Sequence, residues 1–287
     1  MSEVLGKLRV AVGDGPLHTE HERLLRTALR RGDGDPEAAI RDARLSNDYH
    51  PRALEIARRA WTERMRREHH SAAVFSRLLP QLMEAGATLD VKTAVLKMAM
   101  DELRHANLCG SVVELLGGRA ELDTDLATEP LPEHPKCTPL ERALRNVVFV
   151  GCLNETIAVA ILTEERALVV EPAIESVLVQ LVADEIWHAK LGWLYLGEVW
   201  PLLDATQRDR TNAYLPYAFG HLEQALMGPI ARVRFDEALT DELNALGIPA
   251  PQDMREVCDE TLRTTVLPQL DAHGLAATDA WRDRTTV

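Results

Sequence analysis

The sequence contains few aromatic residues and few strand-like stretches of β-branched residues. Aromatic residues make up 5% of the 287 residues, whereas Leu, Ala, Glu and Arg are abundant, which favours helices. Hydrophobic residues reach 46% and charged residues 27%, as in ordinary globular proteins. The composition therefore predicts a soluble, all-α protein, long enough for one large domain or two small ones.

Cysteine is scarce, and long apolar runs are missing. The four cysteines (Cys109, Cys137, Cys152 and Cys258) are widely spaced and form no CxxC pair. This spacing argues against a zinc ribbon, a rubredoxin-type iron site or a disulfide framework. We see no apolar stretch near the start that suits a signal peptide and no window of 18 uncharged apolar residues. We therefore expect a cytoplasmic protein without a membrane span.

Basic residues are fewer than acidic residues. The chain has 32 Lys and Arg residues against 45 Asp and Glu residues, which gives a net charge of -13. Binding to nucleic acid needs a concentrated basic surface to contact phosphates. We therefore expect no nucleic-acid partner.

The pattern along the chain predicts three parts. Residues 1–50 form an N-terminal extension with a short helical candidate around residues 19–31. Residues 51–200 form four long helices, and residues 201–287 form a C-terminal helical segment with helices near 211–226 and 252–269. The three connections between the long helices are a short turn at Gly86–Asp90 with Thr88 as an N-cap, a long crossover from Gly117 to Pro139, and a restart at Glu171-Pro172. A short, long, short pattern is typical of a ferritin-like bundle.

Each long helix carries a stripe of apolar residues three or four positions apart, as in the seam of a helical bundle. An ionisable residue interrupts every stripe near its middle. These residues are Glu68, Glu102, His105, Glu155, Glu185 and His188. A carboxylate in a core costs several kcal/mol, and four facing carboxylates cost more. Two divalent cations would balance four glutamates and leave two neutral histidines as donors. A metal-free bundle with six buried polar residues is the alternative.

Spacing supports the metal-site interpretation. Glu102 with His105, and Glu185 with His188, are three residues apart and so share one helix face. The segments Asp101–Leu108 and Asp184–Leu191 match at their Asp, Glu, His, Ala and Leu positions. Each is preceded by a lone glutamate on the stripe, either Glu68 or Glu155. This internal repeat predicts a pseudo-symmetric pair of helix pairs, with the ligand pattern of di-iron carboxylate bundles.

The motifs resemble known families. Asp101-Glu-Leu-Arg-His105 resembles the motif of bacterial multicomponent monooxygenases such as the methane monooxygenase hydroxylase. Glu68-His-His-Ser-Ala72 and Gly151-Cys-Leu-Asn-Glu-Thr156 look like segments of uncharacterised bacterial ferritin-like proteins. The chain is thus similar to the ferritin-like di-iron superfamily over about residues 52–200. The resemblance implies a four-helix bundle that binds two iron ions through the six residues, as Fe/Fe or Mn/Fe.

The resemblance also assigns neighbouring residues and shows two departures. It implies that Asp101 and Asp184 each orient a ligand histidine, and that Arg104 and Cys109 lie beside the metals. Solvated carboxylates and simple core packing are the alternatives for the aspartates and for Cys109. Trp187 stands where those monooxygenases repeat an arginine. Cys109 stands where ribonucleotide reductase small subunits keep a radical tyrosine, so we expect no stored tyrosyl radical there.

Three functions follow as hypotheses. The first, which the resemblance and the chain length favour, is an O2-activating di-iron oxidase or oxygenase acting on a small organic substrate. No GxGxxG fingerprint follows a strand, so an external reductase or ferredoxin would supply electrons. The second is a ferroxidase, an iron-handling protein or a peroxide-reducing ferritin-like protein. The third is a non-catalytic helical protein that binds a partner. A homodimer is compatible with the sequence, but no residue specifies one.

Overall fold

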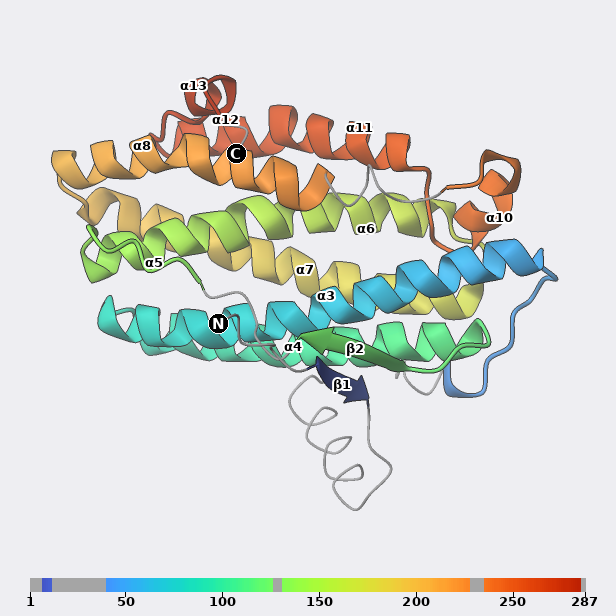
Figure 1. The fold of residues 1–287 in the computed structure, drawn as a ribbon. Coiled ribbons are helices and arrows are strands. Elements are labelled where there is room, and N and C mark those ends of the chain that lie inside the picture. Colours follow the sequence, from blue (N-terminus) through green and yellow to red (C-terminus); the bar gives the residue numbers. More distant parts are fainter. Residues whose placement is uncertain (1–6, 12–39, 126–130, 228–234, 285–287) are drawn as a thin grey trace, which may run out of the picture.

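The computed structural model describes residues 7–11, 40–125, 131–227 and 235–284, and most of these residues are helical. Four long helical segments lie side by side (Figure 1). They are α3 (Pro51–Glu84), α4 (Leu89–Leu115), the continuous segment of α5, η1 and α6 (Pro139–Leu168), and α7 (Pro172–Val199). The predictions of an all-α chain and of these four long helices are confirmed.

Local sequence explains where these helices begin. At α5, Thr138 and Glu141 form a capping box, and Pro139 occupies the first turn, where its missing N–H costs nothing. Pro172 has the same place at the start of α7. Thr88 lies at the predicted N-cap position of α4, yet its side chain makes no capping hydrogen bond. The turn before it uses Gly86 at φ 70°, a conformation that favours glycine.

The third long segment changes geometry in its middle. It begins as α5 (Pro139–Val147), continues as the π-helix η1 (Val148–Glu155) and ends as α6 (Thr156–Leu168). The sequence predicted a regular helix throughout, which is wrong for these eight residues. A π-helix has wider turns than an α-helix and often lies at a functional site. Here it ends on Glu155, one of the six candidate ligands.

The long crossover between α4 and α5 carries a strand that the sequence did not predict. In this crossover β2 (Glu121–Asp125) pairs antiparallel with β1 (Lys7–Ala11), in the register Lys7 with Asp125 to Ala11 with Glu121. The two strands lie beside α3 and α4 (Figure 1). The helix predicted near residues 19–31 lies outside the described residues.

The C-terminal part packs on the third long segment. Its main helices are α8 (Ala205–Leu222), which contacts α5, and α11 (Pro251–Thr261), which contacts α6 (Figure 1). A capping box of Asp204 and Gln207 begins α8 earlier than the predicted residue 211. The helix predicted at 252–269 is present as α11, the π-helix η5 (Leu262–Val266) and α12 (Leu267–Ala272). The remaining short elements are η2 (Trp200–Leu202), η3 (Glu223–Met227), η4 (Glu237–Leu239), α10 (Thr240–Ala245) and α13 (Ala277–Arg282).

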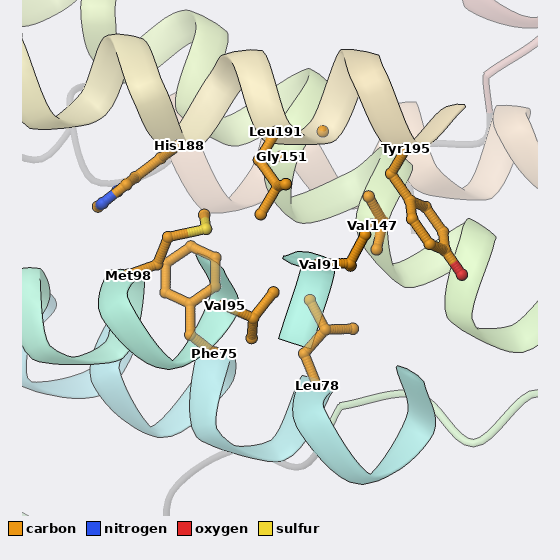
Figure 2. A pocket seen from close by; sticks show the side chains of 11 residues that line it. Phe75, Leu78, Val91, Val95, Met98, Val147, Gly151, His188, Leu191 and Tyr195 are labelled. Carbon is orange, nitrogen blue, oxygen red and sulfur yellow. The ribbon is translucent and has the colours of Figure 1, made fainter. Parts of the chain in front are cut away.

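The buried apolar residues form two clusters. One cluster includes Phe75, Met98 and Tyr195, and the other includes Trp61, Met65 and Cys109. The first cluster contains a narrow pocket between α3, α4, η1 and α7, which Figure 2 shows from close by. The six interrupting residues of the sequence stripes lie on the faces of the long helices between these clusters, so they are surrounded by apolar packing.

Among the described residues, one helical segment is long and apolar enough to cross a membrane. Residues Pro139–Leu168 reach a mean hydropathy of 1.7 over their best window, and 56% of that window is buried inside the protein. A core helix of a soluble protein has the same length and composition. This segment contacts α3, α7, α8 and α11, as a core helix does.

We predict that Glu171→Gln destabilises the fold by about 1–3 kcal/mol at pH 7. Glu171 accepts hydrogen bonds from Ser46 N (2.7 Å) and from the Tyr49 hydroxyl (2.6 Å), and so ties the segment before α3 to the start of α7. Burial opposes its ionisation, but these hydrogen bonds prevail and lower the pKa of Glu171 below 4.5. The stabilisation is therefore complete above pH 4.5 and declines as the pH falls through the lowered value. Urea denaturation of both proteins at several pH values tests this, and an equal difference at pH 7 and well below pH 4.5 would contradict it.

Candidate metal centre

The structure brings all six predicted residues together. α3 contributes Glu68, η1 contributes Glu155, and α4 and α7 each contribute one Glu-x-x-His pair. Five of the six side chains belong to residues that are at most 8% exposed, namely Glu102, His105, Glu155, Glu185 and His188. The Glu68 side chain keeps 15% exposure and lies nearest to solvent.

The six residues form two overlapping groups of converging donor atoms. One group consists of Glu68, Glu102, His105 and Glu185, and the other of Glu102, Glu155, Glu185 and His188. Within each group the donor atoms lie within 4.8 Å of one another. Glu102 and Glu185 belong to both groups. The sequence predicted that each Glu-x-x-His pair would address one metal, and in the structure the glutamate of each pair belongs to both donor groups.

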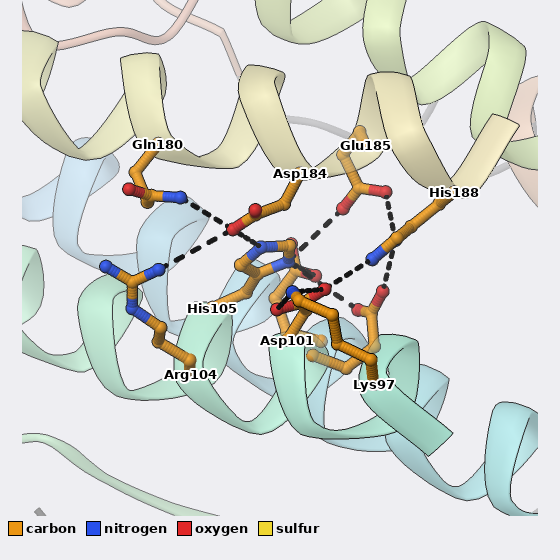
Figure 3. Close-up of polar contacts among 10 residues, drawn as sticks. Lys97, Asp101, Arg104, His105, Gln180, Asp184, Glu185 and His188 are labelled. Atoms are coloured by element: carbon orange, nitrogen blue, oxygen red, sulfur yellow. Dashed lines mark hydrogen bonds and ion pairs between the residues drawn. The ribbon is translucent and has the colours of Figure 1, made fainter. Parts of the chain in front are cut away.

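The two histidines point the same nitrogen into the cluster. His105 Nδ1 lies 3.2 Å from Glu185 Oε1, and His188 Nδ1 lies 3.1 Å from Glu102 Oε1. Their Nε2 atoms face outward and meet the aspartate of the opposite motif (Figure 3). Asp184 Oδ2 lies 3.3 Å from His105 Nε2, and Asp101 Oδ2 lies 3.2 Å from His188 Nε2. Each aspartate can therefore fix its histidine with Nδ1 free to bind a metal, which is how ligand histidines are usually held.

The aspartates are themselves held by polar neighbours. Lys97 and Gln180 occupy equivalent positions four residues before Asp101 and Asp184. Lys97 Nζ lies 2.6 Å from Asp101 Oδ2, and Gln180 Nε2 donates to Asp184 Oδ2 at 2.7 Å. Arg104 reaches from α4 to Asp184, with 3.7 Å between Nη1 and Oδ2 (Figure 3). The sequence analysis missed Lys97 and Gln180, although their spacing of four residues on a helix could have indicated them.

The pKa shifts within the cluster show that burying its carboxylates as charged groups is unfavourable when no cation is bound. Burial and the nearby Glu185 raise the pKa of Glu102 and of Glu155 well above the usual range. Burial opposes the charge of Glu185 too, but His188 and His105 hold its pKa well below the usual range. The surrounding carboxylates outweigh burial and raise the pKa of both histidines. Protons thus partly neutralise the metal-free cluster, and metal ions would replace them.

Two donor atoms of the cluster have no hydrogen-bond partner among the described residues. Glu102 Oε1 and His105 Nδ1 are buried and make no hydrogen bond within the described residues, although each has an oppositely charged atom at about 3 Å. Atoms about 2.1 Å from a shared ion at right angles to each other are themselves about 3 Å apart. His188 Nδ1, by contrast, forms a hydrogen bond with Glu185 Oε2 at 2.8 Å. The two unsatisfied atoms match donors aimed at a common point. Imidazole with carboxylate suits iron, manganese or zinc, so the cluster can hold a metal ion.

Two glycines let the π-helix approach α7. A Cβ atom added to Gly192 would lie 2.6 Å from the Gly151 carbonyl carbon, and one added to Gly151 would lie 2.8 Å from the Gly192 Cα. The two backbones are therefore in direct contact, one turn before Glu155 and one turn after His188. This contact sets the distance between the third long segment and α7 at the level of the cluster.

The remaining predicted residue beside the cluster is Cys109. It is fully buried among apolar residues, and burial together with Glu68 raises the pKa of its thiol. A buried neutral thiol next to Glu68 is compatible with packing beside the site. The sequence analysis missed a buried ion pair on the same side, Arg64 with Glu165, which joins α3 to α6.

Comparisons of the chain with protein-family models, with curated proteins and with solved structures found no match. The assignment of a function therefore depends on the geometry of the cluster and of its surroundings.

We predict that Asp184→Asn weakens metal binding about 10- to 100-fold. An amide can present its N–H groups to His105 Nε2 and so favour the wrong tautomer, and it loses the charge that Arg104 neutralises. Anaerobic titration of the metal-free protein with Fe(II), followed by calorimetry, measures the affinity. Asp209→Asn, the same change at an exposed position on α8, is the control. Equal affinities for the two variants would show that Asp184 does not orient His105.

We predict that Gly192→Ala costs at least about 1–3 kcal/mol of stability and lowers metal occupancy. The new methyl group meets the backbone of Gly151, which cannot rotate away as a side chain can. Gly197→Ala on the same helix is the control, because its methyl group would meet only the His273 ring at 3.3 Å. Thermal unfolding and elemental analysis of both variants check the prediction. A Gly192→Ala protein as stable and as metal-rich as the control would contradict it.

Proposed function

We propose that this chain is a ferritin-like dimetal-carboxylate enzyme that binds two iron ions and uses O2 to oxidise a small organic substrate. The observation that carries the proposal is the pair of overlapping donor groups that share Glu102 and Glu185. Single glutamates from two helices and Glu-x-x-His pairs from two others form the ligand pattern of ferritin-like dimetal bundles. The short, long, short order of connections supports the same fold.

Each residue of the cluster has a role in this proposal. Glu102 and Glu185, which belong to both donor groups, would be shared by the two ions, Glu68 and His105 would complete the ligands of one, and Glu155 and His188 those of the other. When bound, two Fe(II) ions supply electrons for O2 reduction and hard Lewis acidity that the carboxylates tolerate in both oxidation states. Asp101 and Asp184 keep the histidine Nδ1 atoms aimed inward. Glu68, whose side chain is 15% exposed, is the ligand that lies nearest to solvent.

The surroundings favour an oxygenase over an iron-handling protein. A narrow apolar pocket borders His188, so the donor group that contains His188 faces a water-poor side (Figure 2). A monooxygenase reaction inserts one oxygen atom into the substrate and reduces the other to water with two electrons and two protons. The electrons would come from a separate reductase or ferredoxin. Rapid repeated oxidation of Fe(II) by O2 without an organic substrate would instead favour a ferroxidase.

We expect about two iron ions per chain in protein purified with iron supplied, and almost none in the Glu102→Ala, Glu185→Ala double variant. The double variant removes both shared carboxylates, and it should stay folded because it also removes buried charge. Glu114→Ala, Glu175→Ala makes the same change at exposed positions on the same two helices and should leave the iron content unchanged. Elemental analysis, with circular dichroism to check folding, measures this. Iron that the double variant retains would refute the dimetal site.

A further inference from the structure

The outer sides of α4 and α7 carry large apolar side chains that the fold does not bury. α4 packs mainly against α3 and α7, and α7 mainly against α4 and the third long segment, so each has one side that the rest of the described chain leaves open. The C-terminal helices α8 and α11 lie on the third long segment, far from α4 (Figure 1). We call the exposed apolar residues the α4–α7 face. They are 40–78% exposed and comprise Leu89, Leu96, Leu103, Val179, Ile186, Trp187 and Leu194.

This face is apolar along its length and poor in charge. Leu89, Leu96 and Leu103 are seven residues apart, so they form one line along the outer side of α4. On α7 the exposed residues from Val179 to Leu194 include one charged side chain, Lys190. The whole chain, by contrast, has a net charge of -13. A large apolar patch from which charge is depleted is typical of a protein–protein contact.

The internal repeat makes α4 and α7 a symmetric pair. His105 on α4 meets Asp184 on α7, whereas Asp101, one turn earlier on α4, meets His188, one turn later on α7. The two helices therefore run antiparallel. Two antiparallel helices with a repeated sequence are related by a local two-fold axis that passes between them.

The apolar residues of the face follow the same symmetry. Leu96 and Val179 occupy equivalent positions of the repeat, and so do Leu103 and Ile186. In a two-fold homodimer the same patch of both copies meets itself. On this face an apolar line of one copy meets an apolar line of the other, whether α4 lies opposite α4 or opposite α7. A partner of different sequence would require no such symmetry.

We propose that the α4–α7 face binds a second copy of this chain, so that the α4 and α7 helices of two copies pack together in a homodimer. The available area is sufficient. α4 has 27 residues and α7 has 28, so each is about 40 Å long at a rise of 1.5 Å per residue. Two adjacent helices, each about 10 Å wide, present a face of roughly 800 Å2. Stable complexes bury about 800 Å2 on each partner.

The dimer contact adjoins the candidate metal centre. Lys97 follows Leu96, and Arg104 follows Leu103, and these two cations contact the aspartates that face the cluster histidines. The Lys97 side chain is 30% exposed. A second copy on the face would exclude water from these ion pairs, and water weakens exposed pairs. The contact itself requires no metal, so the inference does not depend on the proposed function.

The test is sedimentation equilibrium of the full chain, both metal-free and supplied with iron. We expect a mass twice the 32.0 kDa of one chain. A Leu96→Glu, Ile186→Glu double variant places carboxylates in the contact on both copies and should raise the dissociation constant at least about 100-fold. Circular dichroism should show an unchanged fold, because both positions are exposed in one copy.

Two further variants serve as controls. Val170→Glu, Tyr217→Glu adds the same charge at residues that are 62% and 60% exposed but lie off the face, since Val170 N donates to Ala245 O and Tyr217 is on α8. This variant should remain dimeric. Leu96→Met, Ile186→Leu keeps the face apolar and should also remain dimeric.

Three outcomes would overturn the inference. They are a wild-type chain that is monomeric throughout the micromolar range, a dimer that the Leu96→Glu, Ile186→Glu variant leaves intact, and a monomer that floats with phosphatidylcholine vesicles through this face. The third outcome would assign the face to a lipid surface instead. A face-dependent dimer of a protein that takes up no iron would uphold the inference while refuting the proposed function.

Discussion

Four carboxylates and two imidazoles enclosed between two apolar clusters are the constraint on which the rest of this structure depends. Hydrophobic burial holds the helices together, yet the same packing forces the ionisable groups away from water, where unpaired charge is expensive. In this fold each ionisable group of the cluster lies close to a group of opposite charge or to a hydrogen-bond donor. Histidines face glutamates, aspartates face histidines, and Lys97, Gln180 and Arg104 face the aspartates. Cations at the centre would complete a series of alternating charges that already extends outward to the helix surfaces.

The cross-pairing of the two motifs makes α4 and α7 depend on each other. Each histidine is positioned by the aspartate of the other helix, so neither half of the repeat forms a complete site alone. The halves are nevertheless unequal. Arg104 is 8% exposed and reaches Asp184, whereas Trp187, at the matching position, is 50% exposed with Lys190 Nζ 4.4 Å from its ring centroid. The apolar pocket adjoins His188, while the Arg64–Glu165 pair and Cys109 lie on the side of Glu68. The two donor groups thus have different surroundings, one apolar and one charged.

The sequence predicted correctly those features that depend on the spacing of residues along a single helix. The stripes located the four long helices, and the interruptions of the stripes named all six converging residues, because i, i+3 and i, i+4 spacing determines which side chains share a face. It failed where the information lies in contacts between distant segments. The β1–β2 pairing, the exchange of aspartates between motifs and the backbone contact of Gly151 with Gly192 all join residues far apart in the chain. The pocket could not be predicted either, since it depends on how four segments fit together.

The position of Glu155 depends on the π-helix η1, whereas the packing of the four long helical segments does not. This π-helix contains wider turns than the α-helical stretches on either side of it, and such a segment corresponds to a residue inserted into a regular helix. A chain that lacked one residue between 148 and 155 could continue as an uninterrupted α-helix, with α5 and α6 still facing their present neighbours. The widened turn that presents Glu155 would then be gone. Loss of a single residue in this stretch would therefore keep the helical architecture while changing the turn that presents Glu155 to the cluster.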